Sequence, residues 1–164
     1  EGGKLKYRVR TCTLEDTQKL ADYGYNLAFE TEGKELDRQV LFDGVKNLLL
    51  KPKYGTYYLA DVQQEDGSWK SVGTTMISFE MQPRLGGLVY MIQSVYVDKA
   101  YRSKGCFRAL YTHIVEQAKA DPKTKGVRLY VELDNETAQT VYSKLGMTKM
   151  DTWAFDEKDK VFAH

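Results

Sequence analysis

The stretch from residue 88 to residue 133 constrains the fold more than any other part of the chain. It begins with "LVYMIQSVYV" (88–97), which is nearly all apolar or aromatic, as in a strand buried on both faces. Apolar residues at helical spacing then predict a helix from Phe107 to Ala118, and "VRLYVEL" (127–133) alternates as a strand. A strand, a crossover helix and a second strand form a parallel pair, so these residues predict one sheet with a helix on its face.

The remaining segments add antiparallel strands and further helices. Alternating apolar residues predict three more strands, at 7–12, 56–62 and 71–80. Caps and apolar periodicity predict three more helices, at 13–28, 35–50 and 135–145. Two last strands, "TWAFD" (152–156) and "KVFAH" (160–164), are expected to close the sheet as a hairpin. The fold class is therefore α/β (α+β), with a single mixed, mostly antiparallel sheet flanked by helices in the order β-α-α-β-β-β-α-β-α-β-β.

Length and charge limit the class of protein. A chain of 164 residues can bury a core as a single domain, which we expect over 4–164. Because the chain starts with Glu1, residues 1–3 are expected to be a cloning or processing remnant. Lys and Arg number 24 against 23 Asp and Glu, and a net charge of +1 argues against a general nucleic-acid binder.

Cysteine content and hydropathy suggest a compartment. The two cysteines lie in separate segments and fit neither a disulfide framework nor a zinc site, so we expect a reducing environment and no metal. No apolar run approaches the ~20 residues of a membrane helix. The first residues, "EGGKLK", lack the apolar core of a secretion signal. These features favour a cytoplasmic protein that is not embedded in a membrane.

A basic turn follows the buried strand and opens the predicted helix. In "YRSKGCFR" (101–108), Arg102 and Lys104 flank Gly105. The N-terminus of a helix carries unpaired amides and partial positive charge, and glycine has no Cβ to keep a ligand from the backbone. Such a turn suits a diphosphate, although the same residues also fit a plain solvated turn. The glycine strings of the Walker and dinucleotide-binding loops are absent.

Two motifs resemble those of one family. The turn Arg102-Ser103-Lys104-Gly105-Cys106-Phe107 resembles the acyl-coenzyme A loop of the GNAT N-acetyltransferases, Arg/Gln-x-x-Gly-x-Gly/Ala, with Phe107 at the place of a small residue. Further on, Asn135-x-x-Ala138-x-x-x-Tyr142-x-x-x-Gly146-Met147 resembles the family's fifth-strand and fourth-helix signature, with Met in place of Phe. The predicted order of elements also looks like that family.

The resemblance implies which residues bind acetyl-CoA. Backbone groups of Val95 and Val97 would hold the pantetheine arm as though it were an added strand. Asn135 would contact the same arm from the other strand. The loop would hold the pyrophosphate through Arg102, Ser103, Lys104, Gly105, Cys106 and Phe107, with Arg108 as a further contact. The ring of Phe107 is then expected to point inward and anchor the helix to the sheet, while its amide faces the phosphate.

The resemblance also implies the catalytic chemistry. Tyr142 would protonate the departing thiolate, and the alternative is that Tyr142 is a simple core residue. An alkylamine with a pKa of ~10.4 needs ~4.6 kcal/mol to lose its proton at pH 7, so a base is expected. The family's glutamate is often on the fourth strand, where this chain has Gln93 and Ser94. Glu80 and Glu132 are candidates that could act through water, and the base stays unassigned.

The expected function is an N-acetyltransferase that transfers the acetyl group of acetyl-CoA directly to a primary amine of a small molecule or peptide. An acyl-cysteine intermediate at Cys106 is conceivable, but packing of the loop is the preferred interpretation. Acidic residues in the loops at 24–36 and 149–160 weakly favour a cationic acceptor. The alternatives are a non-catalytic acyl-CoA-binding module and an ATP-binding protein. The expected partners are acetyl-CoA and the acceptor, without nucleic acid or membrane, and a homodimer is left open.

Overall fold

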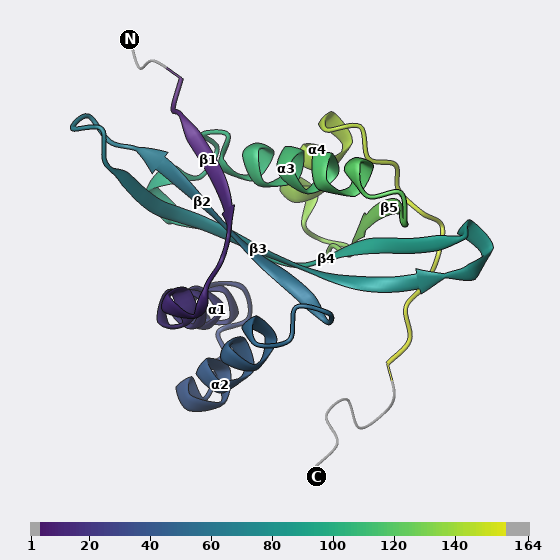
Figure 1. Cartoon of the computed structure of the whole chain (residues 1–164), viewed down its shortest axis with the longest axis horizontal. Helices are drawn as coiled ribbons and strands as arrows, with labels where there is room; N and C mark the ends of the chain where they lie inside the picture. Colours follow the sequence, from purple (N-terminus) through teal and green to yellow (C-terminus); the bar gives the residue numbers. More distant parts are fainter. Residues whose placement is uncertain (1–3, 157–164) are drawn as a thin grey trace. The chain divides into compact units, whose positions relative to one another are not determined.

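The structure is a computed structural model, and it describes residues 4–156. The chain divides into two compact units, residues 1–130 and residues 131–164, and each is described by itself. The first unit contains a sheet and three α-helices, and the second contains one α-helix among its described residues (Figure 1). The expected single domain over 4–164 stays a prediction.

The first unit is built on a five-stranded sheet with the order β1-β2-β3-β4-β5. Its strands are β1 (Tyr7–Thr11), β2 (Gly55–Gln63), β3 (Trp69–Gln82), β4 (Gly87–Val97) and β5 (Thr124–Leu129). The first four pair antiparallel with their neighbours, and β5 pairs parallel with β4. The sheet is therefore mixed and mostly antiparallel, and the parallel pair lies where the strand-helix-strand pattern predicts it.

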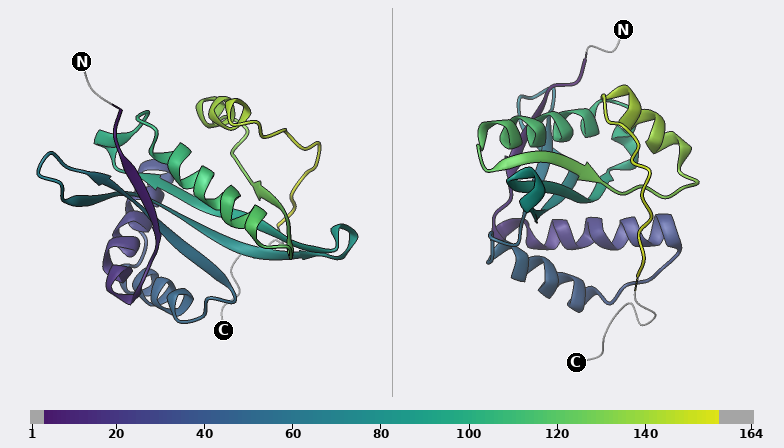
Figure 2. Two further views of the ribbon diagram at one scale, coloured as in Figure 1. Left: turned by 45° about the horizontal axis from the view of Figure 1, so that its top comes forward. Right: turned by 90° about the vertical axis from the view of Figure 1, so that its right-hand side faces the viewer.

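Helices cover both faces of this sheet. On one face lie α1 (Thr17–Glu32) and α2 (Arg38–Leu49), and α3 (Cys106–Ala120) lies on the other (Figure 2). Each face has its own core, because each helix turns one apolar stripe inward. One core joins Leu20 and Tyr23 of α1 to Leu59 and Tyr96 of the sheet, and the other joins Leu110 and its neighbours on α3 to Tyr58, Ala60, Val62, Val72, Ile77, Tyr90 and Ile92.

The buried stripe of α3 differs from the predicted one at its first residue. The buried residues repeat every four positions, at Cys106, Leu110, Ile114 and Ala118. Phe107 is only half-buried, and its ring lies 6.0 Å from that of Tyr111 on the flank of the helix. The expectation that Phe107 anchors the helix was therefore wrong. Cys106 takes that place because it is small enough to fit where the helix begins close to the sheet.

Gly73 of β3 makes this close approach possible. A Cβ at residue 73 would lie 2.6 Å from Cys106 Sγ and 3.3 Å from the carbonyl oxygen of Tyr96. The first of these distances is shorter than any ordinary van der Waals contact. Glycine at this point of the strand therefore sets how closely the N-terminus of α3 lies against β3.

We expect Gly73→Ala to lower the free energy of unfolding by about 2 kcal/mol, because the added methyl group overpacks the site. Cys106→Ala in the same chain removes the sulfur and should recover about half of the loss, which a double-mutant cycle in urea measures as a coupling energy. Gly44→Ala, on α2 with open space around its Cβ, is the matched control and should be neutral or stabilising. Equal stability of Gly73→Ala and the wild type would contradict the contact.

A buried carboxylate fixes β1 to the sheet. Asp61 of β2 accepts hydrogen bonds from Arg8 Nε at 2.9 Å, Arg10 Nε at 3.1 Å and Ser71 Oγ at 2.6 Å. Burial raises the pKa of Asp61, but the bonds from Ser71 and the two arginines outweigh it and hold the pKa below its ordinary value. These bonds set the position of β1, which begins at Tyr7.

Two predicted strands differ from the structure. The strand predicted at 127–133 runs from Thr124 to Leu129, because its pairing with β4 ends at Leu129 opposite Ile92. The strand predicted at 152–156 is absent, and those residues form no regular structure. A strand requires a hydrogen-bonded neighbour, and no described strand pairs with them. The expected partner at 160–164 lies outside the described residues.

The second unit contains α4 (Glu136–Lys144). Its N-terminus is capped as predicted, because Oδ1 of Asn135 accepts a hydrogen bond from the amide of Ala138 at 3.1 Å. Beyond the helix, Gly146 has a φ of 93°, a left-handed conformation that suits glycine at a helix end. The cap at Asn135 and the glycine after the helix therefore predicted both of its ends correctly.

Candidate active site

The carboxyl-terminal half of β4 presents backbone groups that no described strand pairs. The ladder to β5 ends at Ile92, and Gln93 is an extra residue in the ladder to β3. At the end of β4 the amide of Asp98 donates to the carbonyl oxygen of Val72 at 2.7 Å. Because backbone groups alternate along a strand, those of Val95 and Val97 point away from β3. The residues predicted to hold a pantetheine arm therefore lie on this unpaired side of β4.

The basic turn leads from this edge into α3. Ser103 has a φ of 59° and Gly105 a φ of 86°, so two left-handed residues stand close together before the helix. The first intrahelical bond in α3 runs from the amide of Ala109 to the carbonyl oxygen of Gly105 at 3.1 Å. The amides of the residues just before Ala109 have no acceptor within the helix, so they can donate to an anion at the helix N-terminus. A turn with left-handed residues tends to direct successive amides into one concavity.

Two contacts hold the turn in this shape. The hydroxyl of Tyr7 donates to the carbonyl oxygen of Lys104 at 3.0 Å, so a residue of β1 holds the backbone of the turn. Cys106 is buried against Gly73, as described above. Burial and the nearby charge of Asp98 raise the pKa of Cys106 to about 12. A thiol that stays protonated at neutral pH is a weak nucleophile, which supports packing over an acyl-cysteine intermediate.

The basic side chains of the turn differ in their surroundings. Lys104 and Arg108 are exposed, as expected of side chains that could approach a phosphate. Arg102 instead contacts the protein, since its Nη2 donates to Glu30 Oε2 at 2.7 Å and its Nε to the carbonyl oxygen of Val97 at 2.9 Å. The sequence gives no local signal for this contact, because Glu30 lies far away in the chain on α1.

The second unit carries Asn135 and Tyr142. Oδ1 of Asn135 is engaged in capping α4, so only its amide nitrogen could serve a ligand as a donor. Tyr142 is half-buried, and burial raises the pKa of its hydroxyl. The hydroxyl therefore stays protonated at neutral pH, as a general acid requires.

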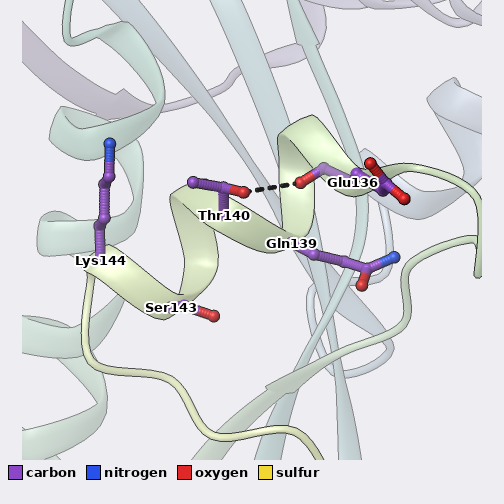
Figure 3. Close-up of a pocket in the computed structure, with 5 residues that line it drawn as sticks. All are labelled: Glu136, Gln139, Thr140, Ser143 and Lys144. Atoms are coloured by element: carbon purple, nitrogen blue, oxygen red, sulfur yellow. Dashed lines mark hydrogen bonds between the residues drawn. The ribbon is translucent and has the colours of Figure 1, made fainter.

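The hollow on the surface of α4 is a poor candidate for an active site. It is lined by Glu136, Gln139, Thr140, Ser143 and Lys144 (Figure 3). The hydroxyl of Thr140 donates to the carbonyl oxygen of Glu136 within the helix at 2.9 Å, and Lys144 lies at the opposite end of α4 from Glu136. These polar groups do not converge on a common point, so they offer no binding geometry for a small ligand.

Of the two candidate bases, one is held in an ion pair and the other is exposed. Glu80 lies 3.7 Å from Arg128 in an ion pair on the sheet, and Glu132 is exposed. Gln93, at the position of the family's frequent glutamate, donates to Ser78 Oγ at 2.7 Å.

Within residues 4–156 no three His, Cys, Asp or Glu side chains group as a metal site. None of the helices in that range is long and apolar enough to span a membrane.

Comparison with known proteins shows where the chain belongs. Residues 21–147 match the family model described as the acetyltransferase (GNAT) family. A possible acetyltransferase from Clostridium difficile 630 is 39% identical, with a TM-score of 0.83 over 93% of this chain and 97% of that one. Among curated proteins, none matches the chain.

More distant structures share the fold. A ribosomal-protein-alanine N-acetyltransferase from Brucella melitensis biovar Abortus 2308 is 16% identical, with a TM-score of 0.69 over 93% of this chain and 99% of that one. An aminoglycoside N-acetyltransferase solved in complex with CoA is 13% identical, with a TM-score of 0.72 over 96% of this chain and 98% of that one. With the family model covering most of its length, this chain belongs to the GNAT family of acetyltransferases.

Proposed function

We propose that this acetyltransferase moves the acetyl group of acetyl-CoA directly to a primary amine of a small molecule or peptide. GNAT enzymes use acetyl-CoA, and one observation carries the proposal for this chain. The turn with left-handed Ser103 and Gly105 opens α3 at the end of the unpaired edge of β4. A turn that suits an anion therefore adjoins backbone groups that no described strand pairs, and this arrangement suits a ligand with a diphosphate and an amide-containing arm.

In this proposal the turn and the edge of β4 bind different parts of the coenzyme. Amides from Ser103 to Phe107 and the side chain of Lys104 bind the pyrophosphate. The backbone of Val95 and the amide of Val97 pair with the pantetheine arm. The carbonyl oxygen of Val97 already accepts a bond from Arg102, so it contributes less than the other groups. The amide nitrogen of Asn135 is proposed as a further donor to the coenzyme.

The proposed reaction forms one bond and breaks another. The amine nitrogen, after losing a proton, attacks the acetyl carbon, and the carbon–sulfur bond then breaks to release the coenzyme thiolate. Tyr142 donates its proton to that thiolate, which its raised pKa permits, because the hydroxyl is protonated over the neutral range. The first proton, which the ammonium group loses before attack, passes to a base for which this chain offers no assigned residue. The second proton, which the nitrogen loses as the amide forms, returns through solvent to Tyr142 and replaces the one given to the thiolate.

One observation favours the alternative of a non-catalytic acyl-CoA-binding module. Where β4 leaves β5, the side chains at the family's frequent glutamate position are those of Gln93 and Ser94, which cannot act as a base. A module of this kind would keep the anion site and lack turnover. Binding alone therefore does not distinguish the two functions.

Free-thiol release distinguishes them. We expect the protein to bind acetyl-CoA in a calorimetric titration and to release coenzyme thiol when one member of an amine panel is added. The panel contains polyamines, amino acids, aminoglycosides and peptides, with matched alcohols as the control for hydrolysis. Binding of acetyl-CoA without amine-dependent release would support the module, and binding of ATP without acetyl-CoA would contradict both.

A further inference from the structure

Arg102 lies at a junction of three elements. Its guanidinium donates to Glu30 at the end of α1 and to the carbonyl oxygen of Val97 at the end of β4, while its own backbone belongs to the turn. The guanidinium carbon also lies 5.5 Å from the centre of the Tyr96 ring. A planar arginine can serve all three contacts at once, whereas a lysine could not.

Glu30 is fully engaged by the same cluster. Oε2 accepts from Arg102 at 2.7 Å and Oε1 accepts from the hydroxyl of Tyr96 at 3.3 Å. Tyr96 is itself buried in the core between α1 and the sheet. Each carboxylate oxygen therefore has its own donor, and the charge of Glu30 is neutralised by Arg102. This leaves Glu30 a poor recognition group for a cationic acceptor.

A second contact joins α1 to Asp98, which lies between β4 and the turn. The hydroxyl of Tyr23 donates to Asp98 Oδ2 at 3.3 Å and lies 3.1 Å from the carbonyl oxygen of Ser71. The rings of Tyr23 and Tyr96 pack with their centres 5.2 Å apart. Tyr23 thus holds the chain between β4 and the turn, and Glu30 holds the first part of the turn through Arg102. Both residues lie on α1.

We infer that Arg102 is a positioning residue, which ties the coenzyme-binding turn to α1 through Glu30 instead of binding the pyrophosphate with its guanidinium. The inference rests on the proposed function of the turn. Its consequence is that Glu30, which has no part in binding phosphate, controls the affinity for acetyl-CoA. The turn amides are directed toward one point only while the ion pair between Arg102 and Glu30 is formed. Removing either partner should therefore lower the affinity for acetyl-CoA to the same extent.

The test compares Arg102→Gln, Glu30→Gln and the double variant by calorimetric titration with acetyl-CoA. Each single variant is expected to weaken binding by about tenfold, and the double variant by no more than either, because all three remove the same half-exposed tie. Arg102→Lys should bind acetyl-CoA almost as weakly as Arg102→Gln, since an ammonium group cannot make both hydrogen bonds. With an identified acceptor, the Michaelis constant for acetyl-CoA should rise while kcat changes little.

Two controls separate this effect from long-range charge. Glu15→Gln removes the same negative charge just before α1 begins and should leave acetyl-CoA affinity unchanged. Lys104→Gln should weaken binding by direct loss of charge, and its effect should add to that of Glu30→Gln. Additivity within the Arg102 and Glu30 pair would overturn the inference.

A phosphate-binding role for Arg102 gives a different pattern. Glu30→Gln would then free the guanidinium and leave binding unchanged or tighter, while Arg102→Gln would weaken it, and this outcome overturns the inference. Urea unfolding of the same variants without coenzyme measures whether the pair is coupled in the free protein, and zero coupling also overturns it. Failure of the wild type to bind acetyl-CoA would instead overturn the proposed function of the turn.

Discussion

Gly105→Trp should weaken acetyl-CoA binding by at least about a hundredfold, or about 2.7 kcal/mol. Gly105 directly precedes α3, where a side chain would stand between the ligand and the amides of the turn. A diphosphate held away from these amides loses at least two charge-assisted hydrogen bonds, each of which contributes about 1.5 to 3 kcal/mol. Isothermal titration calorimetry measures the loss directly.

Backbone strain is a competing cause of weak binding, because Gly105 has a φ of 86°. Gly67 in the turn between β2 and β3 has a φ of 85° and open space around its Cβ, so Gly67→Trp imposes matched strain at a remote position. We expect Gly67→Trp to destabilise the fold by about 1 kcal/mol and to bind acetyl-CoA like the wild type. Similar affinity in Gly105→Trp and Gly67→Trp would contradict the anion site.

Tyr142→Phe should lower kcat by about a hundredfold to a thousandfold, with little change in the dissociation constant of acetyl-CoA. The thiolate must be protonated or hydrogen-bonded as it departs, and phenylalanine keeps the ring while removing the donor. Burial raises the pKa of Tyr142, so the wild-type hydroxyl keeps its proton up to and beyond its usual pKa near 10. Single-turnover thiol release with saturating acetyl-CoA measures the effect.

Tyr111→Phe is the matched control, because Tyr111 is another half-buried tyrosine on a helix. It should retain the full turnover of the wild type. If Tyr142→Phe and Tyr111→Phe turn over equally fast, Tyr142 is a core residue and the proton reaches the thiolate by another route. A parallel rise in the dissociation constant would show that Tyr142 binds the coenzyme without acting as the acid.

Local patterns predicted the parts of the fold that depend on neighbours in sequence. The buried strand ending at Val97, the helix after it and the cap at Asn135 are set by periodicity and short-range hydrogen bonds, and the structure has all three. Distant contacts decide what the patterns miss. Cys106 replaces Phe107 as the buried residue because α3 begins close to Gly73 of β3, where only a small side chain fits.

The candidate site shows the same division. The order of Arg102, Lys104 and Gly105 predicts an anion-binding turn, and the structure gives that turn left-handed residues at Ser103 and Gly105. The partner of Arg102 could not be predicted, since Glu30 is brought to it by the packing of α1 on the sheet. The end of β5 at Leu129 likewise depends on where its pairing with β4 ceases.

A crystal structure of the protein with acetyl-CoA tests the central claim most directly. The account predicts pyrophosphate oxygens within about 3 Å of amide nitrogens between Ser103 and Phe107, with the pantetheine arm paired to the backbone of Val95. Arg102 should keep its bond to Glu30 in that complex. A pyrophosphate bound away from these amides, or an arm that leaves Val95 unpaired, would contradict the account.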